Sequence, residues 1–182
     1  MALTLADIAT LLRQHGTAQY SGEPVTQLEH ALQTAQLAES AGADDELITA
    51  ALLHDLGHLL NDQGDSPTLR GVDDTHQYFA LPFLRGVFSD RVLCAIQWHV
   101  DAKRYLCAVR PDYQAGLSVD SQRSLELQGG IFSDEEAQRF IARAHAGDAV
   151  RLRLWDDQAK IASHTTPSLA HYLDCAERCI VI

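Results

Sequence analysis

Residues 50–60 read Ala50-Ala51-Leu52-Leu53-His54-Asp55-Leu56-Gly57-His58-Leu59-Leu60, so that three ionisable side chains interrupt an otherwise apolar run. Burying an imidazole or a carboxylate without a partner is costly. The segment therefore predicts a buried partner for His54, Asp55 and His58, and a metal ion is the first candidate. Imidazole and carboxylate ligands without thiolate suit iron, manganese, zinc or nickel.

Helical periodicity surrounds this segment, and the sequence shows no alternating strand pattern, repeat or low-complexity stretch. Apolar spacing and turn residues predict helices over residues 4–14, 24–41, 44–61, 74–85, 89–107, 119–127, 134–145, 148–162 and 168–180. In this pattern Pro24 opens the second helix, and His54 and Asp55 lie inside the third. Residues 61–74 are rich in Gly, Asp and Pro, which predicts a long exposed loop near the site. We expect an all-α helical bundle in one domain, residues 1–182.

Composition and charge restrict the class of protein and its partners. The chain has 182 residues, of which 46% are hydrophobic and 21% charged, as in an ordinary single globular domain. The formal net charge of −11 argues against a nucleic-acid partner, because phosphate-binding surfaces are net basic. No apolar run reaches the roughly 18 residues of a membrane span, and the start lacks the basic region of a signal peptide. We expect a cytoplasmic monomer or weak dimer without membrane contact.

The four cysteines form no CxxC pair, and they are Cys94, Cys107, Cys175 and Cys179. Their scattered positions among apolar residues predict reduced, mostly buried thiols. A zinc-binding or redox role is the alternative.

Five predicted helices each carry a side chain that can reach a shared metal site. These side chains are His30, His54 with Asp55, His76, His99 and Asp156. Helical bundles build metal sites in this way, from ligands on facing helices. Any one of these histidines taken singly is more often a surface or core residue, so the prediction depends on the set. The other histidines lie near helix ends or in polar stretches and are interpreted as structural: His15, His145, His164 and His171.

The order of these residues resembles the HD-domain superfamily of helical metal-dependent enzymes, whose ligands follow the pattern H…HD…D. The resemblance implies a core ligand set made of His30, His54, Asp55 and Asp156. Two further histidines between the HD pair and the last aspartate, His76 and His99, mark the dinuclear branch of the superfamily. In that branch Asp55 bridges two metals, one held by His30, His54 and Asp156 and the other by His76 and His99.

Asp157 is the alternative to Asp156 as the last ligand. Asp156 is favoured because it precedes Lys160 by four residues and shares a predicted helix face with Leu152 and Ala159.

Further blocks of sequence carry a more specific resemblance. They read Tyr20-Ser21-Gly22-Glu23 before Gln27-Leu28-Glu29-His30, Ala41-Gly42-Ala43-Asp44, His54-Asp55-Leu56-Gly57-His58, His99-Val100-Asp101-Ala102-Lys103-Arg104-Tyr105-Leu106, Gln128-Gly129-Gly130 and Arg153-Leu154-Trp155-Asp156-Asp157-Gln158-Ala159-Lys160. These blocks are similar to a small oxygenase subfamily, related to myo-inositol oxygenase, that cleaves the C–P bond of 1-hydroxyalkylphosphonates. The resemblance spans residues 18–165 and implies two iron ions as a mixed-valent Fe(II)/Fe(III) pair.

The same resemblance implies that His58, Lys103 and Arg153 bind the phosphonate group of the substrate. His99 and Lys103 are four residues apart and share a helix face, which places an ammonium beside a metal ligand. A solvated helix face is the alternative interpretation of Lys103 and Arg153.

Tyr20 and Glu23 are the catalytic residues that the resemblance implies. In that family Tyr20 occupies an iron position before substrate arrives, and Tyr20 and Glu23 then move away together to admit dioxygen. Glu23 can also face the cationic amine end of a substrate. A plain turn before Pro24 is the alternative.

The implied reaction consumes dioxygen and releases inorganic phosphate from a small phosphonate. (R)-1-hydroxy-2-aminoethylphosphonate would give glycine, and its N-trimethyl analogue would give glycine betaine. A trimethylammonium favours an aromatic cage, for which the chain offers Tyr20, Tyr78, Phe79, Trp98 and Tyr105. The Tyr20–Glu23 segment favours the primary amine.

Two other classes of function remain open. A metal-dependent phosphohydrolase acting on a nucleotide or phosphate ester would use the same ligands with a metal-bound hydroxide as nucleophile. A non-catalytic HD module that binds a phosphorylated effector is the third class, and the intact ligand set argues against it.

Overall fold

Helices account for nearly all regular structure in the computed structural model, which describes residues 2–20, 22–61 and 67–181. The helices are α1 (Leu5–His15), α2 (Gln27–Ser40), α3 (Asp45–Leu53), α4 (Leu56–Leu60), the 3-10 helix η1 (Pro67–Arg70), α5 (His76–Phe79), α6 (Leu81–Leu84), α7 (Asp90–Val109), α8 (Tyr113–Gly116), α9 (Val119–Leu127), α10 (Asp134–Ile141), α11 (Ala146–Asp156) and α12 (Leu169–Arg178). Within the described residues there are isolated bridges but no strand. The predicted all-α class is therefore confirmed.

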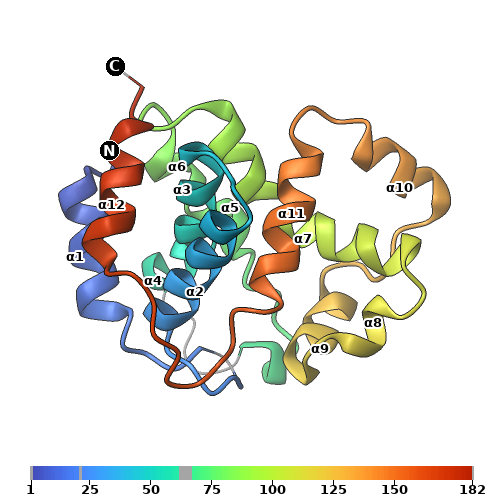
Figure 1. The fold of residues 1–182 in the computed structure, drawn as a ribbon. Coiled ribbons are helices and arrows are strands. Elements are labelled where there is room, and N and C mark those ends of the chain that lie inside the picture. Colours follow the sequence, from blue (N-terminus) through green and yellow to red (C-terminus); the bar gives the residue numbers. More distant parts are fainter. Residues whose placement is uncertain (1, 21, 62–66, 182) are drawn as a thin grey trace.

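Helix α3 lies at the centre of the main hydrophobic core and contacts α2, α7, α11 and α12. Its Leu47, Leu52 and Leu53 are fully buried, and burying each leucine contributes about 1.5–3 kcal/mol to folding. Figure 1 shows α1 and α12 on one side of this core and α7 beside α11 on the other. Helices α8, α9 and α10 gather beyond α7 and α11, around smaller apolar clusters.

The second helix begins three residues later than predicted from Pro24. Helix α2 starts at Gln27 because Thr26 and Glu29 form a capping box. The Glu29 carboxylate accepts a hydrogen bond from the Thr26 backbone N–H (2.7 Å), and the Thr26 hydroxyl accepts one from the Glu29 N–H (3.2 Å). This reciprocal pair satisfies helix-end donors that Pro24 cannot serve.

The helix predicted over residues 44–61 is broken at the HD pair. Helix α3 ends at Leu53 and α4 begins at Leu56, with His54 and Asp55 in a turn between them. Asp55 has φ −102° and ψ 11°, outside the helical range. In a continuous helix the two side chains would point about 100° apart, whereas the turn lets both face the same interior point.

Other predicted helices also differ in extent. The helix predicted over 74–85 is divided into α5 and α6 at Ala80, and the one predicted over 134–145 ends at Ile141. The helix predicted over 148–162 starts at Ala146 and ends at Asp156. The segment that follows leaves the helix, and its carbonyls bind side chains of α2 instead.

The loop predicted over residues 61–74 is described only in part, because residues 62–66 lie outside the described residues. Residues 67–70 form η1, and Leu69 and Val72 are exposed, as expected of such a loop. No described helix is long and apolar enough to cross a membrane. The four cysteines are free thiols, of which Cys94 is half-buried and the others are buried.

Candidate metal centre

The predicted metal ligands converge in the interior, although the chain distributes them over five elements. His30 comes from α2, His54 and Asp55 from the turn between α3 and α4, His76 from α5, His99 from α7 and Asp156 from α11. All are at most 9% exposed. His30 Nε2 lies 3.2 Å from His54 Nε2, and His76 Nε2 lies 3.0 Å from His99 Nε2. The cluster therefore contains two histidine pairs.

Asp55 lies between these two pairs, with one carboxylate oxygen toward each. Its Oδ2 is 3.5 Å from His30 Nε2 and 3.3 Å from His54 Nε2. Its Oδ1 is 3.3 Å from His76 Nε2 and 3.6 Å from His99 Nε2. Asp156 Oδ1 adds to the first pair, 3.4 Å from His30 Nε2. His30, His54 and Asp156 form one donor group and Asp55, His76 and His99 form another, so Asp55 belongs to the second group while its Oδ2 faces the first.

Each of the four imidazoles is oriented through its Nδ1 atom. His30 donates to the Ala159 carbonyl (2.9 Å), His54 to that of Ala51 (2.9 Å) and His99 to that of Ile96 (2.6 Å). His76 instead donates to Asp74 Oδ1 (2.7 Å). A proton on Nδ1 leaves the Nε2 lone pair free to bind a metal, and such outer partners are a regular part of metal sites.

The arrangement of the donor atoms suits coordination of a metal ion better than hydrogen bonding among the side chains. Asp55 Oδ2 and Asp156 Oδ1 are among the few buried side-chain oxygens of the described residues that have no hydrogen-bond partner. Two nitrogens bound to one metal at about 2.1 Å and at right angles lie about 3.0 Å apart, which matches the Nε2–Nε2 distance of each pair. The residues present can therefore hold two cations.

Without a bound metal, protonated histidine balances the charge of the two carboxylates in this cluster. Burial opposes a charged His30, but the adjacent carboxylates of Asp156 and Asp55 raise its pKa to about 9. Burial also opposes ionised carboxylates, yet His54 lowers the pKa of Asp55 and Arg153 lowers that of Asp156, both well below their usual range. Burial, with His76 and His54, keeps the pKa of His99 well below its usual value. A cation binding here would displace the His30 proton.

The structure places Asp156, rather than the alternative Asp157, in this cluster. Asp157 instead binds Arg153 and the Tyr113 hydroxyl. The helix-face argument for Asp156 was wrong in part, because α11 ends at Asp156 and both Ala159 and Lys160 lie beyond it. Asp156 nevertheless faces the cluster, and its second oxygen is held by Arg153 at 2.8 Å.

Asp74 is a site residue that sequence reasoning missed. Its Oδ1 binds His76 Nδ1, and its Oδ2 lies 3.0 Å from His58 Nδ1. Burial opposes its ionised form, but hydrogen bonds from His58 and His76 hold its pKa far below the usual range. Its place two residues before His76 was the available signal, since a nearby acid can orient a metal-binding imidazole.

We expect Asp74→Asn to weaken metal binding at the His76–His99 half of the cluster by roughly 10–100-fold, the usual effect of losing such an outer partner. Asp73→Asn, which removes the neighbouring carboxylate, is the control. Metal retained per chain during titration with a chelator measures the difference. Equal retention in the two variants would mean that Asp74 does not support a ligand.

Gly57 explains how α4 fits beside the site. A Cβ atom at this position would lie 2.1 Å from the His76 carbonyl oxygen and 2.8 Å from its carbon. No such contact is possible, so only glycine permits α4 to approach the start of α5 this closely. The approach places His58 against His76, with ring centroids 4.1 Å apart.

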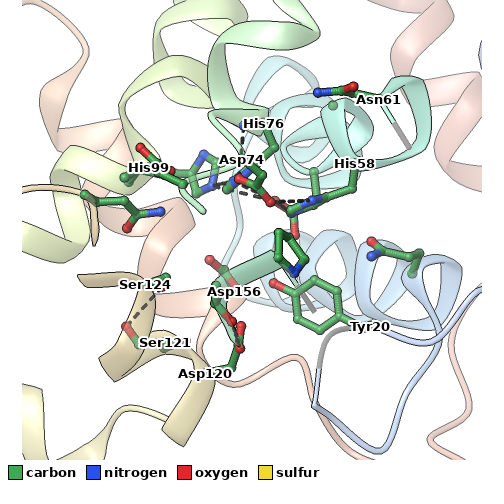
Figure 2. Close-up of a pocket in the computed structure, with 18 of the residues that line it drawn as sticks. Tyr20, His58, Asn61, Asp74, His76, His99, Asp120, Ser121, Ser124 and Asp156 are labelled. Carbon is green, nitrogen blue, oxygen red and sulfur yellow. Dashed lines mark hydrogen bonds and ion pairs between the residues drawn. The ribbon is translucent and has the colours of Figure 1, made fainter. Parts of the chain in front are cut away.

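A cavity of about 700 Å³ opens beside the cluster, and its walls carry the predicted substrate residues His58, Lys103 and Arg153. Figure 2 shows His58, His76 and Asp74 on one side of it and Tyr20, Ser121 and Ser124 on the other. Lys103 is 1% exposed and Arg153 5% exposed, so the solvated-face alternative is wrong for both.

Lys103 and Arg153 are each held in place by neighbouring groups. Lys103 donates to the Ser124 hydroxyl (2.7 Å) and to the Ser121 carbonyl (3.4 Å). Burial, with the Arg153 charge, lowers the pKa of Lys103 to about 7. Arg153 is fixed by its ion pairs with Asp156 and Asp157. The cavity thus presents buried positive charge beside the metal ligands, which suits a small anion.

Tyr20 borders the same site, whereas Glu23 is not among the residues that line the main cavity. The Tyr20 ring stacks on His30, with centroids 4.0 Å apart, and lines the cavity. Burial, with Asp55 and Asp156, raises the pKa of Tyr20 well above its usual value. Glu23 forms an ion pair with Lys160 at 3.0 Å and lines a second, smaller cavity. Lys160 is the second missed residue, and Ser21 lies outside the described residues.

The four histidines interpreted as structural lie outside the metal-ligand cluster. His164 binds Gln36 and His171 binds Glu39 at the surface. His145 precedes α11 and is exposed, and His15 is exposed near the cavity mouth. Of the five aromatic residues considered for a cage, Tyr20 lines the cavity. Trp98 and Tyr105 pack against the cluster around Phe140, and Tyr78 and Phe79 are largely exposed.

Comparison with known proteins agrees with this geometry. The chain belongs to the HD-domain family, whose model matches residues 28–128. The hydroxymethylphosphonate dioxygenase of Gimesia maris is 46% identical over 171 residues, covering 93% of this chain and 85% of that protein. The glycine-betaine-forming 1-hydroxy-2-(trimethylamino)ethylphosphonate dioxygenase of Leisingera caerulea is 36% identical over 177 residues, covering 95% and 88%.

An uncharacterized protein of Acanthamoeba polyphaga mimivirus is also 36% identical, over 168 residues that cover 91% of this chain and 76% of the viral protein. The predicted family membership is confirmed.

Proposed function

We propose that the protein is an iron-dependent dioxygenase that cleaves the C–P bond of a 1-hydroxyalkylphosphonate. One observation carries this conclusion: a carboxylate shared by two histidine pairs lies beside a cavity with buried cations. A dinuclear centre next to an anion pocket suits a phosphonate whose other end reaches the metals. The names of two relatives, both phosphonate dioxygenases, supply the reaction.

In this proposal the residues of the cluster would hold two iron ions. His30, His54 and Asp156 would bind one iron and His76 and His99 the other, with Asp55 shared between them. When bound, a mixed-valent Fe(II)/Fe(III) pair would supply the redox chemistry and oxygen activation that side chains lack. The cytoplasmic location and the monomeric or weakly dimeric state remain predictions.

The side chains around the cavity would bind and orient the substrate. The ammonium of Lys103 and the guanidinium of Arg153 attract the phosphonate oxygens and offer charge-assisted hydrogen bonds. Burial opposes protonation of His58, but Asp55 and Asp74 raise its pKa. Its imidazole would add a third contact to the phosphonate. The walls around these groups limit water, which strengthens their interactions with the anion.

The overall reaction balances without any other co-reactant. The dianion R–CH(OH)–PO₃²⁻ and O₂ give R–COO⁻ and H₂PO₄⁻. The C–P bond and the C1–H bond break, and both oxygen atoms of O₂ are consumed. For the substrates predicted above the acids are glycine and glycine betaine, and for hydroxymethylphosphonate the acid is formate.

We expect the aerobically purified protein to contain about two irons per chain, because the ligands divide into two octahedral-type sets. Oxygen uptake should then equal phosphate release from a 1-hydroxyalkylphosphonate, as measured with an oxygen electrode and a phosphate assay. The alternative phosphohydrolase would release phosphate from esters without oxygen, with manganese, cobalt or nickel bound. Phosphate release that continues under argon would therefore exclude the dioxygenase.

A further inference from the structure

Arg153 is held by two side chains that lie outside both the metal-ligand cluster and the main cavity, Tyr113 and Asp157. The Nε of Arg153 donates to the Tyr113 hydroxyl (3.4 Å), and its Nη2 donates to one carboxylate oxygen of Asp157. The Tyr113 hydroxyl donates in turn to the other oxygen of Asp157. The three side chains therefore form a closed ring of hydrogen bonds that engages both oxygens of the carboxylate.

This ring leaves part of the Arg153 guanidinium for a ligand. An arginine has five N–H donors, and Arg153 is the member of the ring that lines the main cavity. Its Nη1 donates to Asp156 (2.8 Å), and its Nη2 also lies 3.5 Å from the Ser121 hydroxyl. Within the described part of the chain, one N–H on Nη1 is thus left without a protein partner, and the other four keep the guanidinium in one orientation.

Two carboxylates at the end of α11 surround this guanidinium. Asp156 is the last residue of the helix and Asp157 is its C-cap, although acidic side chains are unfavourable at the negative end of the helix dipole. The position of Asp156 follows from its place among the metal-ligand candidates. Once Asp156 binds a cation, Asp157 is the carboxylate that balances the charge of Arg153. Their side chains are 18% and 6% exposed, so losing this counterion would be costly.

Tyr113 fixes the orientation of Asp157 from the connection between α7 and α9. Its ring packs against the apolar cluster of Cys107, Leu117 and Leu125, while its hydroxyl reaches Asp157. Figure 1 shows α8, which begins at Tyr113, next to α9. Burial, with Asp157, raises the pKa of Tyr113 well above its usual value, so the hydroxyl keeps its proton and remains a donor.

From these contacts we infer that Tyr113 and Asp157 are positioning residues for phosphonate binding. Asp157 balances the charge of Arg153 and fixes the plane of its guanidinium, and Tyr113 fixes Asp157. The two residues act through Arg153 and raise its affinity for the phosphonate without touching the substrate. This inference rests on the proposed function, and it gives the connection between α7 and α9 a part in substrate binding.

Two variants test the inference with little change of shape. Tyr113→Phe keeps the ring and removes the hydroxyl, and Asp157→Asn removes the charge of the carboxylate. We expect KM for hydroxymethylphosphonate to rise roughly fivefold in the first and roughly tenfold or more in the second, with kcat changed less. A second 1-hydroxyalkylphosphonate that the enzyme accepts should show the same losses, because it carries the same phosphonate group. Oxygen uptake over a range of substrate concentrations measures KM and kcat.

A double-mutant cycle tests whether the effect passes through Arg153. In an Arg153→Lys background, which keeps a cation but lacks the guanidinium, Tyr113→Phe should change KM by less than about twofold. Tyr172→Phe is the matched control, because it also removes a buried hydroxyl that donates to a carboxylate, that of Glu39 (3.2 Å). Tyr172 belongs to α12, on the other side of the core, and its variant should have the parental KM and kcat.

A binding measurement separates this inference from the proposed function. Methylphosphonate carries the phosphonate group but lacks the C1 hydroxyl, and calorimetric titration of the metal-loaded proteins with it reports affinity without turnover. Tyr113→Phe and Asp157→Asn should weaken this binding by about the same factors as they raise KM. Iron per chain and thermal unfolding of each variant establish that intact proteins are compared.

Each outcome decides a different point. Parental KM and parental methylphosphonate affinity in both variants would overturn the positioning role, even if thermal unfolding were altered. A loss on Tyr113→Phe that is equally large with Lys at position 153 would overturn it too, because the hydroxyl would then act by another route. If no 1-hydroxyalkylphosphonate is turned over, the proposed function fails, while the titrations still decide whether the two residues act through Arg153.

Discussion

Asp55→Ala is expected to bind less than about a tenth of the iron that the parent protein binds, and to lose oxygen-dependent phosphate release altogether. Its two oxygens face different histidine pairs, at 3.3 Å from His54 on one side and 3.3 Å from His76 on the other. Removing the carboxylate takes one ligand from each half and the single negative charge that both halves share. Elemental analysis of iron per chain, together with oxygen uptake, measures the two losses.

The control is Asp134→Ala, which removes an exposed carboxylate from the first turn of α10. It should retain full iron loading and activity. If Asp55→Ala kept two irons per chain, the carboxylate would not bridge the two sites and the dinuclear arrangement would be refuted. Loss of a single iron would assign Asp55 to one half of the cluster.

Lys103→Ala is expected to lower kcat/KM for the phosphonate by roughly 2–3 kcal/mol, or about 30–150-fold, with most of the effect in KM. The substitution removes a buried ammonium from the cavity wall and leaves the phosphonate without a charged partner. Iron content should not change, because no metal-ligand candidate is altered. Steady-state oxygen uptake at several substrate concentrations separates KM from kcat.

Arg139→Ala is the matched control, since it removes a cation from an exposed position on α10. It should have the kinetics of the parent protein. Turnover by Lys103→Ala at the parental rate and KM would show that the phosphonate binds elsewhere in the cavity.

The buried position of Lys103 also predicts a pH dependence. Its pKa is lowered to about 7, mainly by burial and then by Arg153. The ammonium is present below this pH and loses its proton above it, so kcat/KM should fall as the pH rises through about 7. The pH profile of Lys103→Ala should lack this alkaline decrease. A parental profile that is flat from pH 6 to about 9 would contradict the assignment.

Local sequence patterns predicted the starts of those helices that are capped by a side chain directly before them. Ser118 caps α9, which has the predicted bounds. Ser89, the first residue of the helix predicted over residues 89–107, is the N-cap of α7, which starts one residue later at Asp90. The breaks at His54–Asp55 and at Ala80 were not predictable in this way. The first break accompanies the close approach of α4 to the His76 backbone at Gly57, a contact between segments that the periodicity of either one does not report. The second lies just before Pro82, in the first turn of α6, which helical spacing alone does not weigh.

The same distinction applies to the site. The order of histidines and aspartates, with the family resemblance, identified the residues that the structure brings together. Asp74 and Lys160 were missed because their roles depend on partners distant in sequence: His58 for Asp74, and Glu23 for Lys160. Glu23 was expected to face the substrate amine, and its ion pair to Lys160 is a fact of tertiary structure that the motif could not contain.

The hydrogen bonds that orient the four imidazoles have an evolutionary consequence. His30, His54 and His99 donate hydrogen bonds to main-chain carbonyls, which no point mutation can delete. His76 instead donates to the side chain of Asp74. Three of the four imidazoles thus have partners that a side-chain substitution does not remove, whereas the partner of the fourth changes with a single codon. A lineage acquiring a different metal preference, or an engineer seeking one, would find the adjustable position at Asp74.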